Sequence, residues 1–164
     1  MSSQQQPPAI DSQASFAAAL RWGFDAAVAR PARRIVCVDG DFAAWPLDDL
    51  LLLESLTAWL RRPQRRLVLL ARGYDEVPRR WPRFTAWRRD WAHAIEAWQP
   101  PDDLAAELPS LLLADAALSV QLHDAVRWRG RTCTEPREIR PWAEHTDALI
   151  QQSTPAFSIG TLGL

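Results

Sequence analysis

The chain contains no lysine and no asparagine, and all 19 of its basic residues are arginine. Any mechanism that requires a lysine is therefore excluded. Six glycines in 164 residues leave no glycine-rich phosphate loop, because none has the spacing of a dinucleotide or P-loop motif. No serine lies in a Gly-x-Ser-x-Gly elbow, and the three histidines, His93, His123 and His145, are scattered. Nucleophilic hydrolase chemistry and histidine-based metal catalysis have no support.

Cysteine is almost absent as well. Cys37 and Cys133 are the only two, and neither has metal-ligand residues near it in sequence. They form neither a disulfide framework nor a zinc motif, and Cys37 lies in an apolar run typical of a buried strand. No apolar run approaches the length of a membrane span, and the polar start Met1–Ala9 lacks the features of a signal peptide. We expect a cytoplasmic protein with no membrane partner.

The remaining composition is that of an ordinary globular domain, with 48% apolar and 24% charged residues. We expect a disordered leader over residues 1–10, a single domain over 11–155 and an apolar tail over 156–164. The net charge is −1, but residues 61–89 hold ten arginines against Asp75 and Glu76, a local excess of +8. That segment is the main electrostatic feature of the chain.

Hydrophobic periodicity alternates between short β-branched or leucine-rich runs and helical stripes. The runs predict strands over 35–38, 67–71, 93–98 and 125–131 and a hairpin over 111–114 and 117–122. Helical spacing and proline or acidic start signals predict helices over 12–30, 46–62, 79–92 and 141–152. Two apolar strands around one helix form a right-handed βαβ unit. The chain is therefore expected to be an α/β domain with a mixed, mostly parallel sheet flanked by helices.

Asp39-Gly40-Asp41 ends the first predicted strand, where ligands bind in open α/β sheets. With Asp115, these carboxylates could hold Mg²⁺. Haloacid-dehalogenase-like phosphatases and PIN-type ribonucleases begin with a similar acidic motif at the end of a strand, although Phe42 departs from the phosphatase pattern. The favoured alternative is a turn in which the aspartate accepts backbone N–H bonds.

The arginine-rich segment 61–89 is the strongest binding candidate. Arginine pairs bidentately with phosphate and aromatic faces stack on bases, so arginines mixed with tryptophans suit single-stranded nucleic acid. The favoured alternative is a helix whose aromatic stripe faces the core and whose arginines are mostly solvated. The candidate binding residues are Arg65, Arg66, Arg79, Arg83 and Arg88, interleaved with the aromatic residues Trp81, Phe84, Trp87 and Trp91.

The order of elements resembles one lobe of the phospholipase D-like fold, whose catalytic motif is His-x-Lys-x4-Asp. If Asp115 is aligned with the motif aspartate, Leu108 and Ser110 occupy the histidine and lysine positions. The segments Val77–Trp91 and Ser153–Leu164 also look like uncharacterised proteobacterial proteins with such a degenerate lobe. The resemblance implies a homodimer, because phospholipase D-like active sites assemble from two lobes, and loss of the histidine route to phosphodiester cleavage.

Three functions from different classes remain open. The first, which we favour, is a non-catalytic binding or interaction module without a cofactor, with a second copy or another protein as partner. The second is a nucleic-acid or phosphate-binding domain that uses the arginines of residues 61–89. The third is a metal-dependent phosphoesterase that uses Asp39, Asp41 and Asp115, which would then have to converge.

Overall fold

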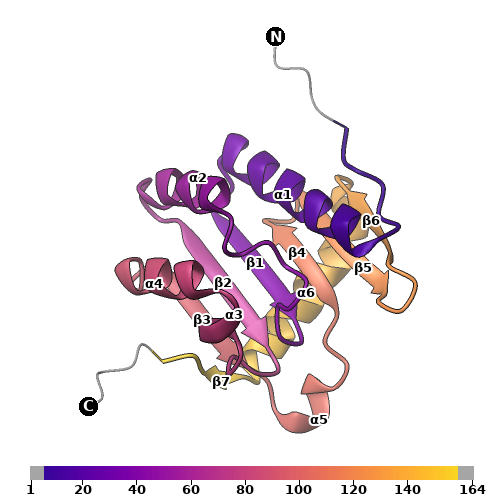
Figure 1. Cartoon of the computed structure of the whole chain (residues 1–164). Coiled ribbons are helices and arrows are strands. Elements are labelled where there is room, and N and C mark those ends of the chain that lie inside the picture. Colours follow the sequence, from indigo (N-terminus) through magenta and orange to yellow (C-terminus); the bar gives the residue numbers. More distant parts are fainter. Residues whose placement is uncertain (1–5, 159–164) are drawn as a thin grey trace.

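The structure, a computed structural model, describes residues 6–158, which form a seven-stranded sheet with helices on both faces (Figure 1). The helices are α1 Gln13–Ala29, α2 Leu50–Leu60, α3 Val77–Arg80, α4 Pro82–Asp90, α5 Asp102–Ala105 and α6 Pro136–Gln151. The strands are β1 Arg34–Asp39, β2 Arg66–Ala71, β3 Ile95–Gln99, β4 Ser110–Ala114, β5 Leu118–Asp124, β6 Arg129–Cys133 and β7 Thr154–Pro155.

The strand order is β6-β5-β4-β1-β2-β3-β7. β1 pairs with β2 and β2 with β3 in parallel, whereas the other four pairings are antiparallel. The α/β fold with a mixed sheet is confirmed, but the sheet is not mostly parallel. The β1–β2 and β2–β3 connections contain helices that return the chain for parallel pairing, whereas the short turns between β4, β5 and β6 allow only antiparallel hairpins.

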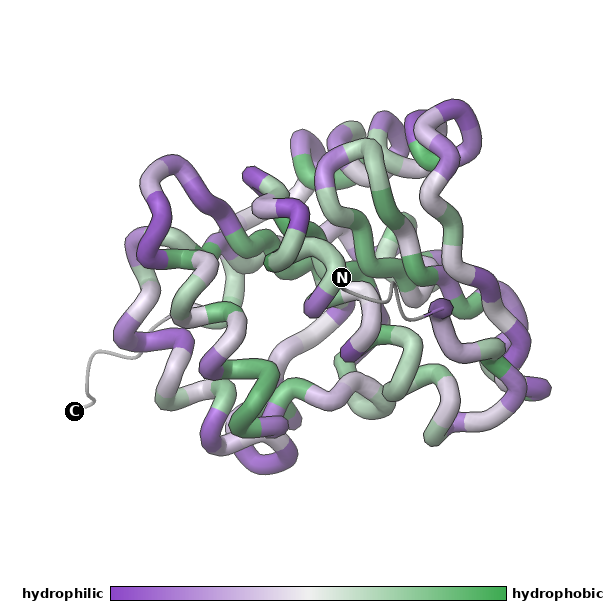
Figure 2. Tube along the Cα trace, turned by 90° about the horizontal axis from the view of Figure 1, so that it is seen from above, coloured by the Kyte–Doolittle hydropathy of each residue, from purple (hydrophilic) through white to green (hydrophobic). Residues whose placement is uncertain are grey.

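Successive side chains of the central strands point to opposite faces of the sheet, so each face has its own apolar core. Ile35 and Cys37 of β1 face one side, where they pack with residues of α1, α2 and α4. Val36 and Val38 face the other side, where α6 covers the sheet through Ile139 and other apolar residues. Hydrophobic segments lie in the middle of the molecule and hydrophilic ones at its periphery (Figure 2).

Sequence signals predicted the start of the first helix correctly but not the division or the start of two later helices. The helix predicted over residues 12–30 is α1, and Ser12 caps it with a capping box to Ser15. The predicted helix 79–92 is two helices, because Pro82 lacks the N–H that would continue α3 into α4. The prediction that Pro141 opens the last helix is wrong, since α6 begins at Pro136 and carries Pro141 inside it. The carbonyl group of Arg137, which Pro141 cannot bond, belongs to an exposed residue and can be hydrated.

Both ends of the described chain take part in the core. Ile10, expected in a disordered leader, is only 6% exposed and packs in the cluster that contains α1. Ala156 and Phe157 of the expected tail also pack against that cluster. Residues 1–5 and 159–164, the rest of the expected leader and tail, lie outside the described residues. Among residues 6–158, no helix has the length and apolar character needed to cross a membrane.

Candidate anion site at the carboxyl ends of parallel strands

Asp39, Asp41 and Asp115 do not converge. Asp39 ends β1, whereas Asp115 accepts hydrogen bonds from the backbone N–H groups of Arg33 and Arg34 at the strand's other end (3.2 and 3.1 Å). Five residue steps along β1 separate the two ends by about 16 Å. Within the described part of the chain, no three His, Cys, Asp or Glu side chains lie close enough to hold a metal ion. The magnesium site that would require these three carboxylates is therefore wrong.

Asp39 organises a turn instead. One of its carboxylate oxygens accepts the backbone N–H of Asp41 (3.1 Å) and of Phe42 (2.8 Å), and the other accepts the hydroxyl of Ser110. Asp41 in turn accepts the N–H of Ala43 (3.0 Å). Phe42 has φ 61°, a left-handed conformation that few bulky residues adopt, and the turn holds it there. This is the turn that the Asp-Gly signal favoured over a metal site.

We expect Asp39→Ala to lower the free energy of unfolding by about 2–3 kcal/mol, because one buried N–H group, one partly buried N–H group and one hydroxyl lose a charged acceptor. Urea denaturation followed by tryptophan fluorescence measures the loss. Asp41→Ala is the matched control, because it removes a single bond at a partly exposed site and should cost about 1 kcal/mol or less. Equal losses in the two variants would contradict the assigned role of Asp39.

The five arginines proposed from sequence do not form one surface. Arg65 and Arg66 lie at the amino end of β2, where Arg66 donates to the carbonyl of His93. Arg79 forms an ion pair with Glu76 in α3. Arg83 lines a groove of about 590 Å³ between α2 and α4, beside the exposed Leu50.

Arg88 is the exception among these arginines, because it is only 5% exposed. It lies on α4 four residues after Phe84 and seven after Trp81, the spacing of one helical face, and Phe84 is 1% exposed. The aromatic stripe faces the core as expected, and Arg88 lies on it. The expectation that the arginines of this helix are mostly solvated holds for Arg83 and Arg89, and Arg88 is the buried exception.

A cavity of about 480 Å³ lies beside Arg88, at the carboxyl ends of β2 and β3. The parallel strands β1, β2 and β3 all end at this edge of the sheet, and in α/β folds such edges are where ligands bind. The loops after β1 and β2 are tied together, because the N–H groups of Arg72 and Gly73 donate to the carbonyl of Gly40 (3.0 and 3.3 Å). The polar and charged residues lining the cavity are Arg72, Tyr74, Asp75, Thr85, Arg88, Arg89, Gln99 and Ser158.

Within the described part of the chain, Arg88 has no acidic partner for its charge. No carboxylate of residues 6–158 forms an ion pair with Arg88, and its Nε has no hydrogen-bond partner among them. One terminal nitrogen donates to the carbonyl of Phe157. Burial lowers the pKa of the Arg88 guanidinium, Tyr74 opposes that shift and Arg89 adds to it. A buried guanidinium stays charged, so this site holds a positive charge that no carboxylate of residues 6–158 pairs with.

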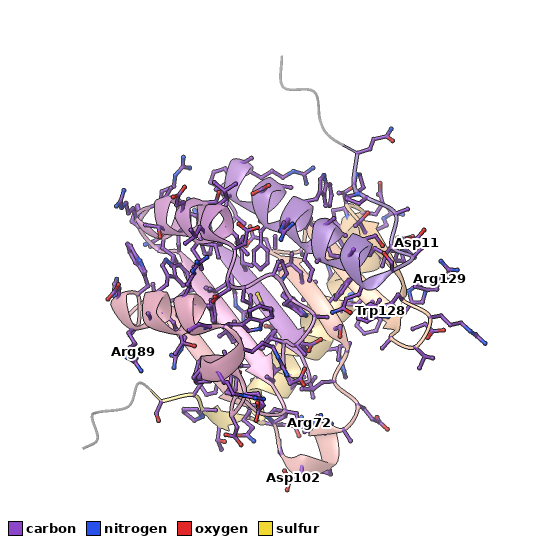
Figure 3. The ribbon with its side chains drawn as sticks, viewed as in Figure 1. Asp11, Arg72, Arg89, Asp102, Trp128 and Arg129 are labelled. Atoms are coloured by element: carbon purple, nitrogen blue, oxygen red, sulfur yellow. The ribbon has the colours of Figure 1, made fainter. Side chains whose placement is uncertain are left out.

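Two exposed arginines extend the positive charge around the cavity. Figure 3 shows that they come from different elements, Arg72 from the loop after β2 and Arg89 from the end of α4. Asp75 is the one carboxylate among the cavity's lining residues, so three arginines and one acidic residue line it. Burial raises the pKa of Tyr74, whose hydroxyl donates to the carbonyl of Trp98 (2.7 Å), so this side chain stays neutral. The arrangement can bind an anion.

Sequence reasoning named Arg88 and included Arg72 and Arg89 in the arginine-rich segment 61–89, but it did not identify the residues that line this cavity. Two of them could have been found, because Arg72 directly follows β2 and Gln99 ends β3, at the edge where Asp39 was already expected. The contribution of Tyr74 and Phe157 had no local signal, since one follows β2 and the other lies near the end of the described chain.

No protein-family model matches the chain, and no curated protein matches it. Its structure is similar to that of the archaeal chromatin protein TrmBL2, with a TM-score of 0.54 and 12% identity, covering 84% of this chain. The match spans 51% of TrmBL2, so the present chain corresponds to about half of that protein. The structure of TrmBL2 is described as showing a novel mode of DNA binding. At this identity the likeness supports the α/β fold alone.

Proposed function

We propose that this chain is a non-catalytic module that binds a phosphate group in the cavity beside Arg88. The observation that carries the proposal is the buried guanidinium of Arg88, 5% exposed, without a carboxylate partner among residues 6–158. Burying an unpaired charge is costly in free energy, and a bound anion would remove that cost.

Phosphate suits the cavity better than a smaller or weaker anion. Arginine presents a planar array of donors that matches phosphate oxygens, and a doubly charged phosphate can engage more than one arginine. Arg72 and Arg89 supply further positive charge at the cavity, and Thr85 and Gln99 are polar side chains that also line it. Neither histidine nor cysteine is among the residues that line it, which favours binding over chemistry on the ligand.

A nucleic acid is a possible carrier of that phosphate, because the similar protein TrmBL2 binds DNA. The geometry favours a single phosphate over an extended strand. A groove that binds a nucleic-acid strand needs cations that follow the phosphate backbone of that strand, whereas Arg65, Arg79 and Arg83 lie at separate places. The net charge of −1 adds no general attraction for a polyanion.

Calorimetric titration of the full chain with inorganic phosphate tests the proposal, with acetate as a weaker anion. We expect saturable binding of phosphate that weakens as salt is added, because the contacts are electrostatic. A single-stranded oligonucleotide with and without a 5′-phosphate distinguishes a terminal phosphate from the strand as the ligand. Absence of saturable phosphate binding at millimolar concentration would overturn the proposal.

The resemblance to a degenerate phospholipase D-like lobe adds a second proposal, that the chain is a homodimer. Leu50 and Leu51 are 54% and 73% exposed on α2, and apolar side chains of this size favour an interface. Sedimentation velocity measures the mass of the species in solution. We expect twice the chain mass of 18.6 kDa, and a species of the single-chain mass at micromolar concentration would contradict the dimer.

A further inference from the structure

Phe157 occupies part of the cavity beside Arg88. Its ring is stacked on that of Tyr74, with centroids 5.0 Å apart and planes 10° apart. The guanidinium carbon of Arg88 lies 3.8 Å from the centroid of the same ring. The backbone carbonyl of Phe157 also accepts a hydrogen bond from Arg88. Phe157 therefore offers a flat ring to two side chains and an oxygen acceptor to one of them.

We infer that the cavity binds a ligand in which an aromatic ring is attached to a phosphate, and that this ring competes with Phe157 for the same place. The inference rests on the proposed function. A ring stacked on Tyr74 and Arg88 would lie where Phe157 now lies, and a phosphate attached to it would reach the same guanidinium.

The contact made by Phe157 is an incomplete substitute for such a ligand. Its carbonyl is neutral and does not compensate the charge of Arg88, and Nε of Arg88 still lacks a partner among residues 6–158. A phosphate would supply both the negative charge and further acceptor atoms. The ligand can therefore displace Phe157 in favour of stronger contacts with Arg88.

The backbone at Phe157 favours its release. Its φ is 51°, in the left-handed region, which is unfavourable for a residue with a bulky side chain. The chain is anchored just before this point, since β7 pairs Thr154 and Pro155 with β3 and the N–H of Ala156 donates to the carbonyl of Ala97 (2.9 Å). Phe157 can leave the cavity without disturbing the sheet.

Phenyl phosphate and inorganic phosphate, titrated against the wild-type chain and Phe157→Ala, test this inference. We expect the variant to bind phenyl phosphate at least about tenfold more tightly than the wild type, because a ring stacked on aromatic and cationic groups no longer meets a competitor. Its affinity for inorganic phosphate should change less than about threefold, which corresponds to under about 0.7 kcal/mol. Phe157→Leu, which keeps an apolar side chain in the cavity, is the control and should stay near the wild type.

The outcomes separate this inference from the proposed function. If both proteins bind inorganic phosphate but Phe157→Ala gains no affinity for phenyl phosphate, the aromatic inference is overturned and phosphate binding stands. If neither ligand binds to either protein, the proposed function fails and the inference fails with it. Chymotryptic cleavage of the wild type after Phe157 gives a readout without mutation. We expect phenyl phosphate to accelerate it, and protection by the ligand would contradict displacement.

Discussion

Arg88→Met should weaken the binding of inorganic phosphate by about tenfold to a hundredfold. A hydrogen bond to a charged group contributes about 1.5–3 kcal/mol, and each 1.4 kcal/mol is about a factor of ten in affinity. Methionine is unbranched and apolar, so it can fill the space of the arginine side chain in the core-facing stripe of α4. Calorimetric titration of the wild type and the variant under the same salt conditions measures the difference.

The same substitution should leave the free energy of unfolding within about 1 kcal/mol of the wild type. Removing an unpaired buried charge favours folding, whereas losing the hydrogen bond and the ring contact with Phe157 opposes it. A ligand contact is thus expected to be lost without loss of the fold. Urea denaturation provides this second measurement.

Arg89→Gln and Arg65→Gln are the matched controls for Arg88. Arg89 lines the same cavity but is exposed, so its loss should weaken phosphate binding less than threefold, or about 0.7 kcal/mol. Arg65 lies at the opposite end of β2 and should have no effect. Equal losses in all three variants would show that general positive charge, rather than the buried Arg88, attracts phosphate.

Trp45→Ala should lower the free energy of unfolding by about 3–5 kcal/mol, a large part of the roughly 5–15 kcal/mol of a typical domain. Trp45 is fully buried and its ring contacts Phe16, Phe24 and Phe42, with centroids 6.4, 6.2 and 5.2 Å away. Removing the ring leaves a cavity that these neighbours cannot fill without moving. Urea denaturation followed by circular dichroism measures the loss.

Trp45 contributes through packing, because its Nε1 has no hydrogen-bond partner among residues 6–158. Trp45→Phe should therefore cost less than half of what Trp45→Ala costs. Trp142→Ala is the surface control, since Trp142 is 37% exposed on α6, and it should cost about 1 kcal/mol or less. A loss at Trp142 as large as that at Trp45 would contradict the assignment of the core.

Local sequence pattern predicted the roles of residues whose partners are close in sequence, but not of those whose partners are distant. A helix start near Ser12 and a turn at Asp39 were predictable, because both side chains make hydrogen bonds to backbone within a few positions. The separation of Asp39 from Asp115 was not predictable. It depends on β4 pairing antiparallel to β1, which places the residue after β4 at the amino end of β1. Pairing partners far apart in sequence have no local signal.

Arg88 shows, within one helix, the same difference between what local spacing predicts and what long-range contacts decide. Its spacing from Trp81 and Phe84 was enough to place it on the buried stripe, since a helix repeats every 3.6 residues. What surrounds it was not available from that spacing. Tyr74 and Phe157, 14 positions before it and 69 after it, meet at Arg88 only because β3 pairs with both β2 and β7.

By itself, the sequence determined the α/β class, most of the helices and strands, and the absence of lysine-dependent or phosphate-loop chemistry. These follow from composition and from periods of two and 3.6 residues, which depend on neighbours along the chain. The tertiary structure alone decided that four of six strand pairings are antiparallel, that three carboxylates do not meet and that one arginine is buried beside a cavity. These features depend on contacts between segments distant in sequence. Bringing such segments together closes long loops at a cost in entropy, which burial of apolar surface in the core offsets.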